Sequence, residues 1–273
     1  RPSMYVPGVL LSSNVNWFCG YYDHTPFNSS DESLLLIHST RHPAWKKPSP
    51  HVPAFILLYD WRKKEVIRSL GETYAWNWQQ GARALWLDSE TVIFNVYDTA
   101  TDSYRARLVD RDGTYRGDLP IPVQEVDKLG RVYSLSYEAL AAIRPDYGYR
   151  NRTPTSKNLT DNGIEQFDPS GGTRHTISRV STLLIEAKKR HGGRITQAKV
   201  NHIMASPDGK RLVFLFRYFV SGRRVTDLYQ MSTDAGTPSL VVGDCGVSHV
   251  CWWDDDAVIA TMRGADGFGY FHV

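Results

Sequence analysis

The chain has few cysteines and no long apolar run. Three cysteines (Cys19, Cys245, Cys251) among 273 residues are too few for a disulfide framework. We expect reduced thiols, with a Cys245–Cys251 pair as the alternative, and their spacing supplies too few ligands for a zinc site. No stretch approaches the roughly 18 apolar residues that a membrane span needs, so no span is expected.

The compartment is left open by the sequence. The chain opens at Arg1-Pro-Ser-Met without a signal-peptide pattern, and a leader removed earlier is the alternative. Both the cytoplasm and the periplasm or a secreted location therefore fit.

Strong charge of one sign is also lacking. The net charge is +3, and no block of Lys and Arg marks a surface for nucleic acid or anionic membrane. The chain contains no phosphate-binding glycine loop, no Gly-x-Ser-x-Gly elbow and no His-Glu-x-x-His motif. These absences argue against nucleotide chemistry, a serine hydrolase of the elbow type and a zinc protease.

What the chain does have is a repeated strand–turn–strand unit. Residues 201–217 read as an apolar strand, a Ser206-Pro-Asp-Gly turn and a second apolar strand. Proline presets φ, aspartate caps the local backbone and glycine accepts positive φ, so this turn has a physical basis. Related units begin near residues 24, 83, 123 and 249.

Repetition of several short strands at roughly 40–50-residue intervals predicts a β-propeller. An ordinary β-sandwich is the alternative. We predict one all-β propeller domain over residues 1–273, with four-stranded blades and about five blades present. The expected blades are 21–72, 76–120, 121–177, 200–243 and 247–273, with a helical insertion at 178–191 that Ser178 or Ser181 caps.

Alignment of the repeats brings four polar side chains into register. His24, Arg83, His202 and His249 each lie nine or ten residues before the next apolar strand. Equivalent positions of a propeller face the same level of its axis, so we expect a ring of three imidazoles and a guanidinium. A single histidine is usually structural, whereas three in register favour a functional site.

Aromatic and amide side chains lie beside this ring in the sequence. Tyr22 precedes His24, and the run Trp76-Asn77-Trp78-Gln79-Gln80 precedes Arg83. Aromatic faces and amides are what a carbohydrate pocket uses, although a tryptophan pair in a blade core explains the same run equally well. Arg217, at the end of a strand, could bind a carboxylate with both nitrogens or make an ordinary salt bridge.

The motifs Gly20-Tyr-Tyr-Asp-His-Thr-Pro-Phe, Trp76-Asn-Trp-Gln-Gln-Gly, Arg144-Pro-Asp-Tyr-Gly-Tyr, Asn201-His-Ile-Met-Ala-Ser-Pro-Asp-Gly and Ser248-His-Val-Cys-Trp together resemble a bacterial polysaccharide-locus propeller family. That family is similar to the seven-bladed oligogalacturonate and ulvan lyases. The resemblance implies axial histidines that bind a divalent metal (Mn, Zn or Ca), here His202 and His249. It also implies two further blades, from missing sequence or another chain.

These observations favour a propeller that acts on an acidic glycan by β-elimination. Such a reaction needs a cation at the uronate carboxylate, a base for the C5 proton and an acid for the leaving oxygen. Arg83, Arg217 or the metal fits the first role, His24 or His202 the second, and Tyr22 or Tyr137 the third. Trp76, Trp78, Asn77, Gln79, Gln80 and Asn201 are expected to bind substrate.

Two other functions stay open. The first is a non-catalytic glycan-binding or scaffold propeller associated with polysaccharide biosynthesis, because the fold serves that use as well. The second is a hydrolase with paired carboxylates, for which Asp23 is the only acid beside the ring.

Overall fold

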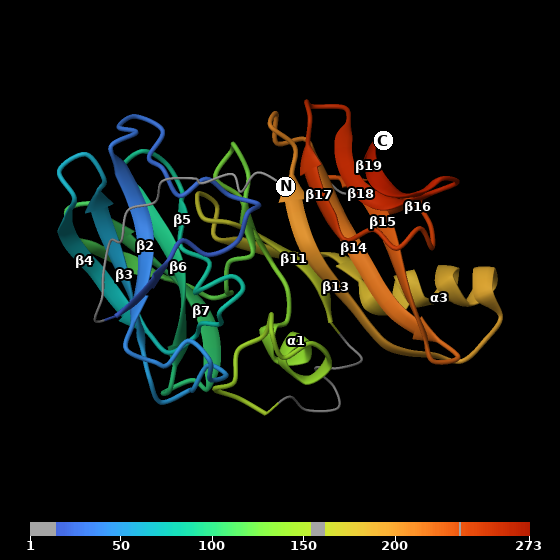
Figure 1. The fold of residues 1–273 in the computed structure, drawn as a ribbon, viewed down its shortest axis with the longest axis horizontal. Helices are drawn as coiled ribbons and strands as arrows, with labels where there is room; N and C mark the ends of the chain where they lie inside the picture. The colour runs from blue at the N-terminus through green and yellow to red at the C-terminus, as the bar shows by residue number, and fades with distance from the viewer. Residues whose placement is uncertain (1–14, 154–161, 235) are drawn as a thin grey trace, which may run out of the picture.

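The protein is built from five antiparallel β-sheets, and the computed structural model describes residues 15–153, 162–234 and 236–273 (Figure 1). Each sheet is an up-and-down meander in chain order. The strands of the first two sheets are β1 (Asn16–Phe18), β2 (Leu34–Thr40), β3 (Ala54–Asp60) and β4 (Glu65–Thr73), then β5 (Leu85–Trp86), β6 (Thr91–Asp98), β7 (Ser103–Asp110) and β8 (Tyr115–Leu119).

The remaining three sheets follow the same pattern. They comprise β9 (Glu125–Val126), β10 (Val132–Ser134), β11 (Gly163–Asp168) and β12 (Thr173–Arg179); β13 (Ile195–Ala205), β14 (Arg211–Val220), β15 (Arg223–Ser232) and β16 (Ser239–Val242); and β17 (His249–Trp252), β18 (Val258–Gly264) and β19 (Gly267–His272). The all-β propeller prediction is confirmed, with four sheets of four strands and one of three in the described residues.

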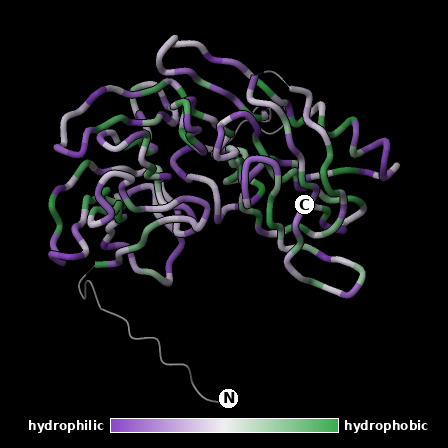
Figure 2. The backbone as a smooth tube through the Cα atoms, turned by 90° about the horizontal axis from the view of Figure 1, so that it is seen from above, coloured by the Kyte–Doolittle hydropathy of each residue, from purple (hydrophilic) through white to green (hydrophobic). Residues whose placement is uncertain are grey.

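The first two sheets lie on one side of the molecule and the last two on the other, with β11 and α1 (Tyr137–Ile143) between them (Figure 1). Seen from above, these two groups of sheets stand side by side (Figure 2). The first sheet starts at β1, several residues before the expected start of blade one at residue 21. β1 pairs with β2 through Asn16 and Thr40, so the lead-in adds the first strand of this sheet.

The Ser206 turn forms through the chemistry that the sequence predicts. The Ser206 hydroxyl donates to Asp208 Oδ1 (2.6 Å), and the Lys210 N–H donates to the same oxygen (3.0 Å). Gly209 has a φ of +75°, which only glycine adopts without strain. The turn thus fixes where β13 ends and where β14 begins.

The predicted helix is present as α3 (Val180–His191), but its predicted cap is wrong. Arg179 occupies the N-cap position and makes no side-chain capping bond, so neither Ser178 nor Ser181 caps the helix. The extended β12 runs directly into the helix at this point, which leaves no turn for a serine cap. The C-terminus matches expectation, because Gly192 takes the left-handed conformation with φ +64°.

The three cysteines are free, as expected. Within the described residues no helix is long and apolar enough to cross a membrane.

A buried carboxylate fastens α3 to the fourth sheet. Asp227 on β15 is fully buried and accepts bonds from Arg190 (2.6 Å), the Tyr218 hydroxyl (2.8 Å) and the Asp244 N–H (2.9 Å). These three donors satisfy an otherwise costly buried charge.

We predict that Asp227→Ala lowers the free energy of unfolding by about 3–5 kcal/mol, because it removes the carboxylate partner of Arg190 and the acceptor of two further donors. Denaturant unfolding measures this change. Glu186→Ala removes an exposed carboxylate that pairs with Lys189 on α3, and it should cost under about 1 kcal/mol. Equal losses in the two variants would contradict the anchoring role.

Candidate functional site

An ion pair holds a loop at the propeller axis. Residues 20–24, here called the axial loop, follow β1, and Asp23 of this loop accepts two 2.9 Å bonds from Arg83 Nη1. Both side chains are about 1 % exposed. Burial raises the pKa of Asp23, but the adjacent Arg83 guanidinium outweighs it and holds that pKa below its usual value. Arg83 also donates to the Gln124 carbonyl, so it joins three sheets at the axis.

His24 and Glu125 form a pair at one end of the axial loop. His24 Nε2 lies 3.2 Å from a Glu125 carboxylate oxygen. Burial lowers the pKa of His24, yet the carboxylate prevails and the net direction is upward. A cavity of about 410 Å³ is lined by Asp23, His24 and Glu125 on one side and by the Ser206 turn and Trp252 on the other.

His202 lies deeper, beneath two tyrosine rings. Its ring is 5.1 Å from that of Tyr21 and 5.5 Å from that of Tyr147, and the two phenolic oxygens are 3.3 Å apart. Burial lowers the pKa of His202 to about 3. Its φ of +54° matches that of Arg83 at +52°, so two of the positions aligned by the repeat share a strained left-handed backbone.

Buried polar atoms without partners gather around His202. Both ring nitrogens of His202, both amide atoms of Asn201 and Nε of Arg217 are buried with no hydrogen-bond partner among the described residues. Arg217 makes one bond, from Nη2 to the Ser248 carbonyl (3.1 Å), and burial lowers its pKa. Buried polar groups are almost always satisfied by protein, water or ligand, so these five atoms are candidates for contacts with a polar ligand.

Tyr22 and His249 form the exposed side of the same cluster. Tyr22 is 48 % exposed, its ring lies 5.1 Å from that of His249, and its hydroxyl accepts from the Val250 N–H at 3.4 Å. His249 Nδ1 is 2.9 Å from the Ser248 hydroxyl. We call this set the axial site; it comprises Tyr21, Tyr22, Tyr147, Asn201, His202, Arg217 and His249.

The structure brings only some of the predicted residues into the axial site. Tyr22, Asn201, His202, Arg217 and His249 meet there. Arg83 instead pairs with Asp23 of the axial loop, and His24 lines the neighbouring cavity of about 410 Å³.

The tryptophan run donates hydrogen bonds to the loop at residues 41–53. Trp76 is 2 % exposed and donates its indole N–H to the Val52 carbonyl, and Trp78 donates to the Lys46 carbonyl (2.7 Å). Asn77 closes its own turn by accepting from the Gln80 N–H (2.7 Å). Gln79 is exposed, and Gln80 is buried beside the axial loop. These contacts fit the blade-core alternative, and substrate binding by this run stays a prediction.

Tyr137 is fully buried on α1. Its hydroxyl is 2.8 Å from both the Val123 carbonyl and Gln124 Oε1, and its ring stacks on Tyr149 at 4.2 Å. Burial raises its pKa above the usual range. A hydroxyl so enclosed has no open path to a glycan in this structure, so Tyr22 is the better placed of the two predicted acids.

The described residues do not fit a divalent metal. No group of three or more His, Cys, Asp or Glu side chains among them could hold an ion. His202 and His249 stand without the further carboxylate or imidazole ligands that Mn, Zn or Ca requires. The metal stays a prediction from resemblance, and no chemical step is derived through it.

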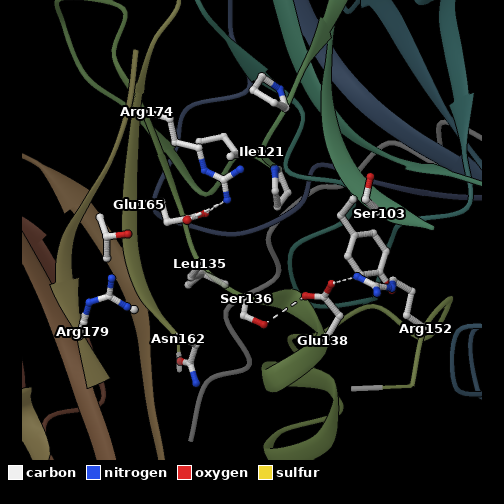
Figure 3. Close-up of a pocket in the computed structure, with 15 residues that line it drawn as sticks. Ser103, Ile121, Leu135, Ser136, Glu138, Arg152, Asn162, Glu165, Arg174 and Arg179 are labelled. Atoms are coloured by element: carbon white, nitrogen blue, oxygen red, sulfur yellow. Dashed lines mark hydrogen bonds and ion pairs between the residues drawn. The ribbon is translucent and has the colours of Figure 1, made fainter. Parts of the chain in front are cut away.

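A cavity of about 500 Å³ lies apart from the axial site, between the second and third sheets. Its acids and bases largely satisfy one another. Glu165 accepts from Arg174 (2.8 Å), and Glu138 accepts from Arg152 (2.6 Å) and from the Ser136 hydroxyl (3.1 Å), as Figure 3 shows. Paired charges leave less for a ligand to neutralise, so this cavity is the weaker candidate despite its size.

Sequence reasoning assigned no role to Tyr147 or Glu125, and it noted Tyr21 only as part of the motif beside His24. Tyr147 lies within the Arg144-Pro-Asp-Tyr-Gly-Tyr motif, so a signal was present, but its contact with His202 joins the turn after α1 to β13, which are far apart in the sequence. Glu125 carries no sequence signal, because it lies about a hundred residues from its partner His24 along the chain.

Five antiparallel meanders in chain order are the pattern of a β-propeller. The propeller domain of the trilobed protease from Pyrococcus furiosus is similar in structure, with a TM-score of 0.51 and 14 % identity over 90 % of this chain and 64 % of that chain. At that identity the likeness shows the fold alone.

Two oligogalacturonate lyases are also similar, more distantly. One is a manganese complex, at TM-score 0.45 and 12 % identity; the other, from Vibrio parahaemolyticus, is at 0.46 and 10 %. Each match covers 94 % of this chain and 74 % of the lyase. No protein-family model matches the chain, and no curated protein matches its sequence.

We predict a loss of stability in mild acid from two neutral buried histidines. The pKa of His202 is about 3 and that of His38 about 4, both lowered first by burial, against about 6.5 in the unfolded chain. The unfolded state therefore binds more protons below pH 6.5. The free energy of unfolding should fall by about 1.4 kcal/mol per pH unit for each histidine between pH 6 and 4.5.

His202→Asn, which tolerates the left-handed backbone, should remove about half of this slope. His38→Gln keeps an acceptor for the Ala82 N–H and should remove the other half. Denaturant unfolding across this pH range supplies the slopes, and an unchanged slope in His202→Asn would show that His202 is not buried neutral.

Proposed function

We propose that the axial site binds an acidic glycan and acts on it by β-elimination. The observation that carries the proposal is the set of unpartnered buried polar atoms on Asn201, His202 and Arg217. Nothing anionic pairs with Arg217 in the described part of the chain, although it is only 8 % exposed. A carboxylate with a ring and hydroxyls around it supplies the missing partners for a guanidinium, an amide and an imidazole.

The surroundings suit a sugar. Tyr21, Tyr22 and Tyr147 lie around the unpartnered atoms and offer ring faces for C–H surfaces and hydroxyls for hydrogen bonds. The motif resemblance to oligogalacturonate lyases supports the same class of substrate, a polymer of uronates.

The reaction assigns one role to each reachable group. Arg217 neutralises the uronate carboxylate, which acidifies the C5 proton. His249 takes that proton at Nε2 when its Nδ1–H donates to the Ser248 hydroxyl. The electron pair forms the C4–C5 double bond, the C4–O bond breaks, and the leaving oxygen takes a proton from Tyr22.

The pKa of Tyr22 is raised to about 12, mainly by burial of its ring, so the phenol is protonated at neutral pH and can act as the acid. The exposed sides of Tyr22 and His249 leave both groups open to a ligand on the axis.

A test compares Arg217→Met with the wild type by calorimetric titration with oligogalacturonate. Loss of a charge-assisted bond of about 1.5–3 kcal/mol should weaken binding about 10- to 100-fold. Arg107→Met breaks a half-exposed pair with Asp118 on the second sheet and should bind like the wild type. Equal binding by both variants would refute the assignment of the axial site.

Ultraviolet absorbance of the unsaturated uronate product separates catalysis from binding. The wild type should release product, and Tyr22→Phe should bind the glycan with product formation lost. Binding without product in the wild type would instead favour the non-catalytic glycan-binding propeller.

A further inference from the structure

A second cation lies directly beside Arg217, across the strand pair. Lys199 on β13 is the cross-strand neighbour of Arg217 on β14, and the two are 6 % and 8 % exposed. Residues opposite each other in an antiparallel pair have Cβ atoms about 4.5–5.5 Å apart. Lys199 makes no hydrogen bond or ion pair with any residue that the structure describes.

The charges around Lys199 are all of its own sign. Burial, Arg217, Arg144 and Arg224 together lower the pKa of Lys199 to about 8. Arg144 itself lies 3.6 Å from Asp146, whose carboxylate is mostly exposed. Arg144 in turn lies over the Tyr147 ring at 5.3 Å, which links this cluster to the axial site.

Such an arrangement is unfavourable without an anion. Like charges opposite each other weaken a strand pair, and a largely buried lysine without a carboxylate partner loses part of its hydration. Lysines are almost never buried unless paired. Lys199 also faces the same side of β13 as Asn201, two residues on, whose amide has no partner either.

We propose that Lys199, flanked by Arg144, binds a second anionic group, carried by the glycan unit next to the one whose carboxylate Arg217 holds. The site then takes at least two consecutive acidic units, and a single uronate fills only half of it. This inference rests on the proposed function for its ligand, whereas the anion subsite itself rests on the four cations and the strand pairing.

The experiment compares Lys199→Met with Lys188→Met, which removes an exposed lysine of α3 that is outside the cluster. Thermal unfolding is followed with inorganic phosphate, with monogalacturonate and with digalacturonate, because a ligand that binds the folded state raises Tm. We expect phosphate to raise the Tm of the wild type, Lys188→Met and Lys199→Arg, and to lose most of that effect in Lys199→Met. Affinity should rise at least tenfold from monogalacturonate to digalacturonate, and Lys199→Met should abolish this rise.

The outcomes separate the two ideas. Loss of phosphate protection in Lys199→Met with no glycan binding by any variant keeps the anion subsite and overturns the glycan as its source. The subsite is overturned if phosphate raises the Tm of Lys199→Met and Lys188→Met equally, and if both variants gain the same affinity from monogalacturonate to digalacturonate. This holds even if Arg217 still binds uronate.

Stability without ligand gives an independent check. Replacement of an unpaired buried cation by methionine should leave the Tm equal or higher. A lower Tm for Lys199→Met would show that the lysine serves the fold, and would overturn the proposal.

Discussion

The buried pair between Asp23 and Arg83 is the interaction on which the axial site depends. It fixes the axial loop of the first sheet against the second sheet, and the Arg83 bond to the Gln124 carbonyl extends the link to the third. Tyr21 and Tyr22 precede Asp23 directly, so their positions against His202 and His249 follow from this pair. A charge pair that is 1 % exposed is costly to form and more costly to break on one side.

The contrast between paired and unpaired cations organises the rest of the molecule. Asp127, Asp227 and Glu165 each meet an arginine, and these pairs join turns, helix and strands. Arg217 and Lys199 lie in the interior without such a partner. Among the described residues these two cations depart from that pattern, and functional sites often depart from rules that favour stability.

Much of the fold could be predicted, because it is encoded locally. The Ser206 turn and the repeated strand pairs carry their own turn chemistry, and the register of His202 with Arg83 follows from counting residues. The site could be predicted only in part. Lys199 meets Arg217 through a strand register shifted by a bulge near His202. Tyr147 reaches His202 from the turn after α1. No short stretch of sequence encodes either contact.

The contact between Tyr22 and the Val250 N–H spans 228 positions of the chain. Closure of so long a segment comes late, because local meanders form faster than distant pairings. During synthesis the first four sheets can each assemble as they emerge, but the axial loop meets β17 only after the fifth sheet exists. Ligand binding at the axial site therefore depends on the folding of the whole chain. A molecule whose fifth sheet is lost or misfolded keeps its tyrosines and arginines, but its axial site is incomplete.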